Sequence, residues 1–463
     1  MWVNCAAACC VALLVLPALA RGTDRYTISA RPDLDQLTVR ACFEGRPPQR
    51  LAPADGEDLR WLNAVRSPGP LRVARRRDGL ALSGGGDGDC LEYDIALAAA
   101  SRAHAARADT VERLLPSGAW LWRAPDRTAR VRFELPRGLA ASVPWTPHPG
   151  GWVPGPTQGR WSDLTAFGRF EERRLDVPGS RLRLAVLGGA DPDAMATWLA
   201  EAARAVATVH GRFPVPQAQL LVVPIGPRGE AVPWAQVRRG GGCGAHFFVD
   251  PTRPLAEFRA DWTATHELSH FLLPFVARRD AWFSEGVASW YQNVARARAG
   301  MLPESEAWQR LHDGFRRGMA ATDGVSTLRA VTAARSRGRG GAVMRIYWSG
   351  AALWMLADLE WRRQGTAPER ALARLADCCL QGGRTWSARE LAARLDALAG
   401  APALVPLVDR WLDSERFPDL AAAYDELGLV ADGGRLRLDA RPAARSLRRA
   451  IMSAAMDAAG TAP

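Results

Sequence analysis

Alternating apolar and polar positions mark the first third of the chain. Residues 26–30 (Tyr-Thr-Ile-Ser-Ala) and 37–43 (Leu-Thr-Val-Arg-Ala-Cys-Phe) alternate as half-buried strands do, and residues 90–95 and 129–135 show similar patterns. Gly and Pro punctuate the intervening segments, including a turn at 84–88. The pattern predicts an N-terminal β-sandwich domain over residues 21–178.

The hydrophobic period changes near residue 181. Apolar runs at 181–187, 219–224 and 245–249 predict strands, and Asp191-Pro192 predicts the start of a helix that reaches about residue 210. A further helix is expected from about Glu257. We therefore predict an α/β domain over residues 179–300, in which strands feed into helices.

Helical patterns dominate the remainder. Apolar stripes at 304–315 and 351–361, a capping box at Ser387 and Glu390, and a helix through 408–412 predict a helical domain over 301–430. The Ala-, Arg- and Gly-rich residues 431–463 predict a short strand and a loose tail. The expected fold class is therefore α+β and multidomain.

The charge of the chain is strongly positive. It has 463 residues, a formal net charge of +11, and no lysine, so every basic residue is arginine. This charge favours contact with acidic surfaces or polymers. The arginines are dispersed among acids and no nucleic-acid-binding motif is present, which argues against nucleic acid as a partner.

Residues 1–20 have the pattern of a signal peptide. An apolar run from Cys5 to Leu16 leads into Pro17-Ala-Leu-Ala20, a cleavage pattern before Arg21. This predicts export to the periplasm or the extracellular space. The alternative is an uncleaved anchor, the one case in which we expect a membrane partner, but the run is short for a span and Pro17 interrupts it.

Five cysteines follow the predicted signal: residues 42, 90, 243, 378 and 379. An exported protein can hold disulfides. Cys42 and Cys90 lie in strand-like segments of one domain and are the candidate pair. Bridging adjacent residues is strained, so Cys378 and Cys379 are expected to be thiols on a helix, and Cys243 is expected to be unpaired.

The candidate chemistry begins with an H-E-x-x-H motif. On a helix, His266 and His270 project from one face and can hold one zinc ion. Glu267 between them can act as general base toward the attacking water. Zinc needs a third protein ligand, and Glu285, at the start of the next helical pattern, is the natural candidate. The alternative is a buried helix with two solvent-satisfied histidines.

Two further segments resemble the gluzincin aminopeptidases. The segment Asp280-x-Trp-Phe-Ser-Glu285-Gly-x-Ala is similar to the D-x-W-x-N-E-G-x-A of that family, and Tyr347-Trp-Ser-Gly-Ala is similar to its Y-x-K-G-A. The turn Arg296-Ala-Arg-Ala-Gly300 resembles the R-x-R-A-G of the glycyl-aminopeptidase type. The resemblance implies a β-sandwich followed by a thermolysin-like domain.

The resemblance also implies roles for three side chains. Glu285 would be the third ligand of one zinc ion per chain, and the Tyr347 hydroxyl would bind the oxyanion of the tetrahedral intermediate. Asp280 would orient a ligand or cap the second helix.

One segment departs from the family pattern. In the family, the segment before the zinc helix forms an edge strand to which substrate adds, and it carries a Glu that holds the free amino terminus of the substrate. Residues 240–246 contain no acid, and neither Glu230 nor Glu257 matches the pattern. Exopeptidase and endopeptidase activity therefore both stay open, and His246 on this segment is a candidate substrate contact.

Two other features allow two interpretations each. The arginine-rich residues 334–341 are either a solvated loop or a cleft lid that favours acidic or C-terminal carboxylate groups. The tryptophans of the first domain either pack its core or stack on carbohydrate, and packing is favoured.

These observations predict a secreted zinc metallopeptidase that acts on peptides or proteins, possible aminopeptidase activity included. Its site residues would be His266, His270 and Glu285 for zinc, with Glu267 and Tyr347 for catalysis. The alternatives are a catalytically silent scaffold that binds peptides or envelope components, and an endopeptidase without amino-terminal preference. The patterns do not bear on the oligomeric state.

Overall fold

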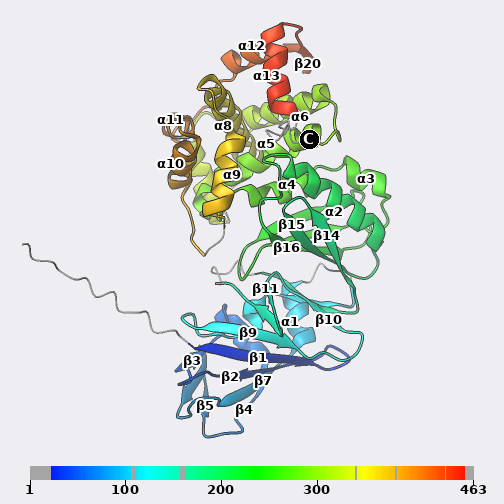
Figure 1. The fold of residues 1–463 in the computed structure, drawn as a ribbon, viewed down its shortest axis with the longest axis vertical. Helices are drawn as coiled ribbons and strands as arrows, with labels where there is room; N and C mark the ends of the chain where they lie inside the picture. Colours follow the sequence, from blue (N-terminus) through cyan, green and yellow to red (C-terminus); the bar gives the residue numbers. More distant parts are fainter. Residues whose placement is uncertain are drawn as a thin grey trace, which may run out of the picture.

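The computed structural model describes residues 22–105, 108, 110–156, 163–338, 341–380, 383–432 and 434–453. The predicted signal peptide, Trp161 and residues 454–463 of the predicted tail lie outside this part. Three regions follow one another along the long axis: a β-rich N-terminal region, a five-stranded sheet with helices, and a helical region (Figure 1). Within the described residues, no helix has the length and apolar character needed to cross a membrane.

The N-terminal region is built on a seven-stranded sheet in the order β11-β12-β9-β1-β2-β7-β4. Two three-stranded sheets, β3-β6-β5 and β10-β13-β8, accompany it. The strands are β1 (Thr23–Ala30), β2 (Leu37–Cys42), β3 (Arg50–Leu51), β4 (Leu62–Arg66), β5 (Arg72–Arg76), β6 (Gly79–Ser83), β7 (Cys90–Ile95), β8 (Arg113–Leu115), β9 (Thr128–Phe133), β10 (Ala140–Ser142), β11 (Thr146–His148), β12 (Gly151–Val153) and β13 (Thr165–Gly168). One helix, α1 (Leu97–His104), and two short 3₁₀ helices, Gly56–Trp61 and Ser117–Ala119, lie between the strands.

These sheets share one hydrophobic core. Alternation buries Tyr26 and Ile28 of β1, as the sequence pattern predicts, and residues of the small sheets join the same core. Trp120, Trp122 and Trp145 are fully buried in it, so the packing interpretation of these tryptophans is confirmed.

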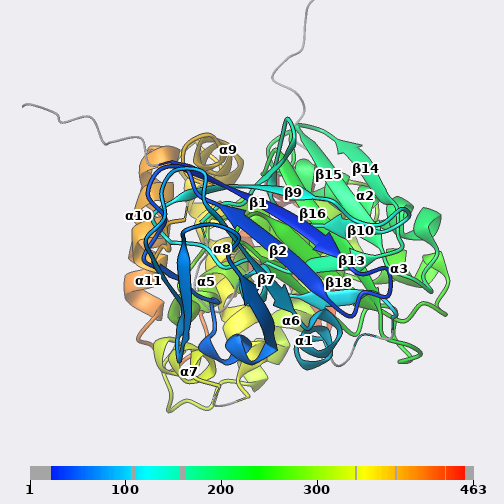
Figure 2. The same ribbon diagram turned by 90° about the horizontal axis from the view of Figure 1, so that it is seen from below.

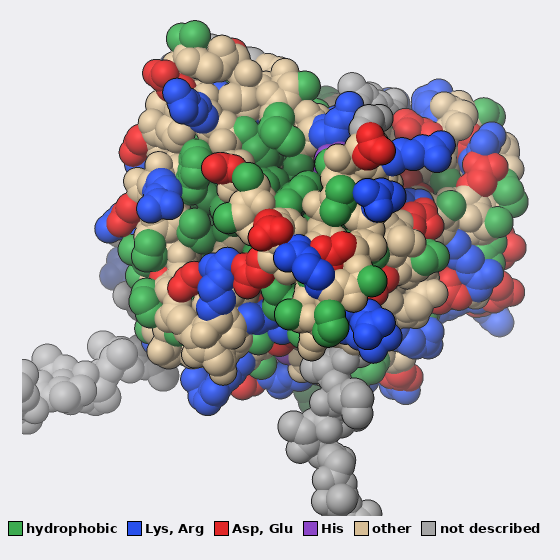
Figure 3. Space-filling view, turned by 90° about the horizontal axis from the view of Figure 1, so that it is seen from above, with side chains coloured by type: hydrophobic (Ala, Val, Ile, Leu, Met, Phe, Trp, Pro, Cys, Tyr) green, Lys and Arg blue, Asp and Glu red, His purple; other side chains and the backbone are tan. Residues whose placement is uncertain are grey.

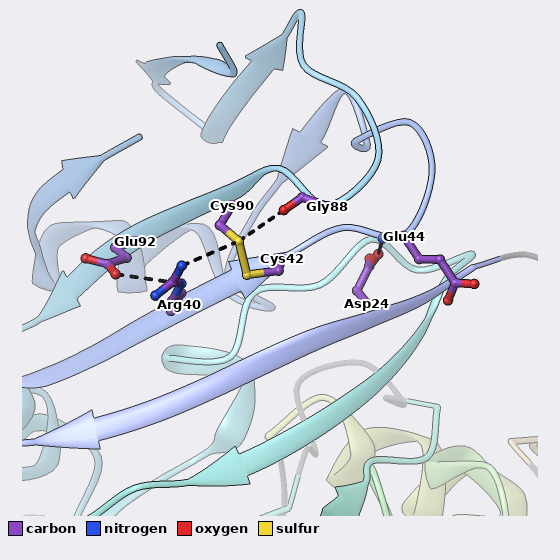
Figure 4. Close-up of a disulfide and its surroundings, with 7 residues drawn as sticks. All are labelled: Asp24, Arg40, Cys42, Glu44, Gly88, Cys90 and Glu92. Atoms are coloured by element: carbon purple, nitrogen blue, oxygen red, sulfur yellow. Dashed lines mark hydrogen bonds and ion pairs between the residues drawn. A yellow bond between two sulfur atoms is a disulfide. The ribbon is translucent and has the colours of Figure 1, made fainter. Parts of the chain in front are cut away.

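A disulfide joins two neighbouring strands of the seven-stranded sheet. Cys42 on β2 and Cys90 on β7 are directly opposite each other in the antiparallel register and are bonded (Figure 4). The predicted pair is confirmed, and Cys243 is free as expected. The expectation for Cys378 and Cys379 is wrong, because these neighbours form a second disulfide at the end of α9.

The middle region contains a five-stranded sheet in the order β14-β15-β16-β18-β17. β15, β16 and β18 are parallel, whereas β14 and β17 pair antiparallel at the two edges. The strands are β14 (Glu172–Val177), β15 (Ser180–Val186), β16 (Gln217–Pro224), β17 (Trp234–Arg238) and β18 (Gly244–Val249). The three parallel strands match the predicted ones, but both edge strands are additions, and the sheet begins upstream of residue 179.

Helices cover this sheet and continue into the third region. Helix α2 (Pro192–Ala207) begins as predicted, because the Asp191 carboxylate accepts hydrogen bonds from the N–H groups of Asp193 and Ala194. Seen from below, the N-terminal sheet lies in front of the middle sheet, with α5 and α8 beyond (Figure 2). The remaining helices are α3 (Leu255–Ala260), α4 (Thr263–Ser269), α5 (Ala281–Arg298), α6 (Glu304–Ala320), α7 (Leu328–Ser336), α8 (Val343–Arg363), α9 (Pro368–Cys378), α10 (Ala388–Ala399), α11 (Leu404–Trp411), α12 (Ala421–Leu427) and α13 (Pro442–Met452).

Three expectations for the helical part need correction. The single helix expected from about Glu257 is two helices, α3 and α4, because the backbone is extended at Asp261. The expected arginine-rich loop begins inside α7, which ends at Ser336. Residues 431–463 contain the expected short strand, β20 (Arg435–Leu438), which pairs with β19 (Leu429–Asp432), but residues expected to be loose form α13, whose Ile451 carbonyl accepts a hydrogen bond from buried Arg298.

Candidate functional site

Helices α4 and α5 bring three side chains together. His266 lies on α4, and His270 directly follows it at the start of a 3₁₀ turn, His270–Leu272. Glu285 lies at the start of the second turn of α5, which follows another 3₁₀ turn at Arg278–Asp280. The Nε2 atoms of His266 and His270 lie 3.3 Å and 3.5 Å from Oε2 of Glu285. Two atoms each about 2.0 Å from a tetrahedral zinc ion are about 3.3 Å apart, so this spacing suits one ion.

The other ring nitrogen of each histidine is held by α5. Nδ1 of His266 lies 2.8 Å from Oε1 of Gln292, and Nδ1 of His270 lies 2.9 Å from Oγ of Ser284. Partners at Nδ1 fix the ring orientation and leave Nε2 available for a metal. The sequence reasoning missed both partners, although Gln292 lies two helical turns beyond Glu285 and therefore on the same face.

Charge and burial act together on the Glu285 and His270 side chains. Burial alone would raise the pKa of Glu285, but the charge of His270 and hydrogen bonds from both imidazoles outweigh it and hold that pKa well below its usual range. Burial alone would lower the pKa of His270, but the Glu285 carboxylate outweighs it and raises that pKa. The His270 imidazole and the Glu285 carboxylate therefore favour opposite charges and attract each other.

Glu267 points into a cavity of about 300 Å³ beside these residues, and the edge strand β17 lines the same cavity. The backbone N–H of Val237 on β17 donates a hydrogen bond to the Glu267 carboxylate. Burial raises the pKa of Glu267, the charges of His270 and His266 oppose that rise, and the net pKa is raised. A raised pKa suits a carboxylate that must accept a proton and release it again.

Tyr347 on α8 completes the group. Its ring stacks on His266 with centroids 5.6 Å apart, and its hydroxyl hydrogen-bonds Glu285. Burial and then the charges of Glu285 and Glu267 raise the pKa of Tyr347 well above its usual value. The phenol is therefore protonated at neutral pH and can donate a hydrogen bond.

Two glycines let α5 and α8 approach closely. A Cβ added at Gly286 would lie 2.5 Å from the Cα of Gly350, and one added at Gly350 would lie 2.2 Å from the carbonyl oxygen of Trp282. Both contacts are with backbone, which cannot move aside alone. The close approach of α5 and α8 brings Glu285 and Tyr347 next to each other. It requires glycine at positions 286 and 350.

The Gly286→Ala variant is expected to lose both stability and activity. The added methyl group forces α5 and α8 apart, and overpacking of this kind costs about 1–3 kcal/mol. A shift of about 1 Å at Glu285 is expected to lower kcat/KM by about 10²-fold. Thermal unfolding and peptide kinetics measure both effects. The control is Gly341→Ala, because an added Cβ there meets nothing within 4 Å; equal behaviour of the two variants would contradict the role of the contact.

The site opens to a cleft with apolar and polar parts. Trp234, 46% exposed, lies on the wall of the first cavity, and Trp262, 42% exposed, lines a cavity of about 560 Å³ on the other side of Tyr347. Buried Ser289 and Asn293 line that second space and have side-chain atoms without a hydrogen-bond partner in the described structure. Viewed from above, one face shows hydrophobic side chains in a hollow with a histidine at its edge (Figure 3).

Several predicted placements near the site are wrong. The edge strand is β17, upstream of residues 240–246, and β18 lies inside the sheet. His246 on β18 is fully buried between Gln219 and Gln236, and burial lowers its pKa to about 3, so it does not face the cleft.

The structure also places three acids near the site. Asp280 stands at the N-cap position of α5 but makes no side-chain cap bond there; its carboxylate accepts a hydrogen bond from the N–H of Ala388, the first residue of α10. Glu257 pairs with Arg253 on the neighbouring turn of chain. Glu230 is exposed before β17 and does not line the cavities beside the site.

Comparison with known proteins gives no match among family models or curated proteins. Solved structures do share the fold. An aminopeptidase N family protein from Idiomarina loihiensis aligns with a TM-score of 0.63 and 12% identity over 88% of this chain and 79% of its own. An M1 zinc metallopeptidase from Deinococcus radiodurans aligns with a TM-score of 0.52 and 16% identity over 86% of this chain and 94% of its own. Yeast LTA4 hydrolase, solved with bestatin, aligns with a TM-score of 0.53 and 10% identity over 88% of this chain and 70% of its own.

The chain has the fold of the M1 zinc metallopeptidases. This finding confirms the α+β multidomain class and the gluzincin architecture predicted from the motifs. In this fold, Glu267, His270, Glu285 and Tyr347 line one cavity, and His266 joins them through its contact with Glu285, although the five residues come from α4, the turn after it, α5 and α8.

Proposed function

We propose that the protein is a zinc-dependent peptide hydrolase. One observation carries the proposal: the Nε2 atoms of His266 and His270 converge on Oε2 of Glu285, while Glu267 and Tyr347 face the same space. The fold supports it, because structural neighbours are described as zinc metallopeptidases, and a mutant of the Deinococcus radiodurans enzyme was solved with a Tyr-Ser-Ala substrate.

The donor set fits zinc. Two imidazole nitrogens and one carboxylate oxygen are a common ligand set of catalytic zinc, and each histidine has the supporting partner at Nδ1 that such sites need. The cavity adjoining these donors provides room for water and substrate. When bound, zinc acidifies water and polarises the carbonyl of the peptide bond.

The residues of the chain then have separate roles. Glu267 takes a proton from the attacking water and later delivers it to the leaving amine. Tyr347 donates a hydrogen bond to the oxygen that becomes negatively charged. The outer edge of β17, paired on one side only with β18, offers backbone groups to an extended peptide.

Hydrolysis of unstructured peptides by the purified, zinc-loaded chain tests the proposal. Activity is expected to fall to background after metal removal by a chelator and to return with added zinc. The Glu267→Gln variant serves as the control for contaminating peptidases. Activity that persists in this variant would contradict the proposed function.

We also propose that the protein is exported. The proposal rests on the signal-like pattern of residues 1–20 and is supported by the two disulfides, which form and persist in oxidising compartments. The intact mass of the protein recovered from the cell envelope or medium is expected to match a chain that begins at Arg21. A mass that includes residues 1–20 would favour an uncleaved anchor.

A further inference from the structure

Two adjoining cavities extend along the substrate side of the site. The cavity next to Glu267 and β17 continues into a second one of about 440 Å³, bounded on its far side by α7. Phe275, Arg278, Ala281, Glu285 and Tyr347 line both cavities. A peptide whose scissile bond lies between Glu267 and Tyr347 therefore has both cavities within reach of its neighbouring residues.

Apart from the side chains of the proposed catalytic site, the charged residues that line these cavities are arginines. Arg239 and Arg278 line the first cavity, and Arg278 and Arg335 line the second. Among the described residues that line them, the only carboxylates are Glu267 and Glu285, and both belong to the proposed catalytic site. The remaining side chains therefore present positive charge to a substrate in a partly enclosed space, where charge acts strongly.

Arg239 is fixed in position. Its Nη2 donates a hydrogen bond of 2.5 Å to the carbonyl oxygen of His270, and its guanidinium lies 5.3 Å from the centre of the Phe271 ring. Within the described chain, no carboxylate forms an ion pair with it. A half-buried, held guanidinium without a partner charge among the described residues is suited to an anionic ligand, since little entropy is lost when one binds.

Arg335 projects from the last turn of α7. It is exposed, and in the described part of the structure it forms no ion pair. It lines the same cavity as Tyr347. Arg335 therefore lies within electrostatic reach of the place where the substrate carbonyl would be attacked.

Among the described residues that line these two cavities, no acid other than Glu267 and Glu285 is present to bind a free amino terminus, and Asp313 lines the separate cavity beside Trp262. The edge strand β17 reads Trp-Ala-Gln-Val-Arg, and residues 239–244 that follow are Arg-Gly-Gly-Gly-Cys-Gly. A protonated amine placed there would meet arginine instead of a carboxylate. We propose that the site selects peptides by a carboxylate bound near Arg239, Arg278 and Arg335, and that it requires no free amino terminus.

This inference rests on the proposed hydrolase function, so the test separates the two. Internally quenched peptides of one length, acetylated and amidated at their ends, carry either Glu or the isosteric Gln at the positions flanking the scissile bond. A third peptide carries Gln and a free C-terminal carboxylate, which distinguishes a side-chain carboxylate from a terminal one.

Values of kcat/KM are measured for the zinc-loaded wild type, for Arg335→Gln, and for Arg337→Gln. Arg337 is the matched control, because it is an exposed arginine two residues away that lines neither cavity.

The wild type is expected to cleave the blocked peptides and to prefer a carboxylate over Gln by at least about tenfold, the effect of one hydrogen bond to a charged group. The ratio is expected to fall toward one in Arg335→Gln and to stay unchanged in Arg337→Gln. Cleavage without this preference, a ratio unchanged in Arg335→Gln, or cleavage restricted to free amino termini would overturn the inference and leave the hydrolase function standing.

Binding to the Glu267→Gln variant, measured by fluorescence anisotropy with the same peptides, gives an answer that does not depend on turnover. A carboxylate preference in binding without hydrolysis by the wild type would support the inference and contradict the hydrolase function. Equal binding of the Glu, Gln and free-carboxylate peptides would overturn it.

Discussion

The Glu267→Gln variant is expected to lower kcat by about 10³-fold while zinc binding is retained, because general acid–base catalysis contributes about 10²–10⁴-fold. Gln has the size of Glu but cannot take a proton from water. The hydrogen bond from the Val237 N–H can still reach the amide oxygen, so the position of the side chain should change little. The proposed zinc donors are His266, His270 and Glu285, which the substitution does not alter.

Single-turnover kinetics on a quenched peptide, together with metal analysis of the same samples, measure this effect. A variant that retains zinc and loses turnover supports Glu267 as the base. If the variant kept more than about a tenth of the wild-type kcat, another group would have to accept the proton.

The Tyr347→Phe variant is expected to lower kcat by about 10²-fold, with a smaller change in KM. Loss of one hydrogen-bond donor to a developing oxyanion costs about 10²–10³ in kcat, because the contact strengthens in the transition state. The Phe ring keeps the stacking on His266, which is 5.6 Å away between centroids. Only the hydroxyl is removed, and the ring continues to fill its space.

The Tyr347 hydroxyl also hydrogen-bonds Glu285, so its loss could act through the metal site instead. Zinc affinity of the Phe variant separates the two explanations. Unchanged affinity with reduced kcat supports a direct role toward the substrate oxygen. A loss of zinc that accounts for the whole fall in activity would assign Tyr347 to the support of Glu285.

Local patterns could predict that His266, His270 and Glu285 lie close together, because this proximity follows from helix geometry. The spacing of His266 and His270 places both on one face of a helix, whatever the rest of the chain does. The placement of Glu285 needed only that the next helix fold back on α4, which a short connection favours. Ser284 and Gln292 could have been found by the same helical period, since both share the face or turn of Glu285.

Long-range pairing was less predictable. The edge strand β17 has five residues between Pro233 and a glycine-rich segment, and its extended form depends on pairing with β18. Its sequence pattern alone is too short to indicate a strand, so the substrate-facing position was assigned to the segment around His246. The expected edge was therefore β18, whereas the edge of the sheet is its neighbour β17.

The tail shows the same limit. Residues 442–452 have a composition rich in Ala and Arg, which indicated a loose segment. In the structure they form α13, where Arg448 donates hydrogen bonds to the carbonyl oxygens of Leu427 and Asp439. These partners lie in the preceding helix and hairpin, and no local pattern identifies them.

The zinc content of the purified chain, measured beside the Glu285→Ala variant, tests the central claim most directly. The structure predicts one zinc ion per wild-type chain, because two imidazoles and one carboxylate converge at zinc-ligand spacing. Removal of Glu285 should weaken binding by at least about 10²-fold, leaving two donors and an incomplete site. A wild-type chain that holds no zinc after supplementation, or a variant that binds it equally well, would contradict the account and favour a catalytically silent scaffold on the same fold.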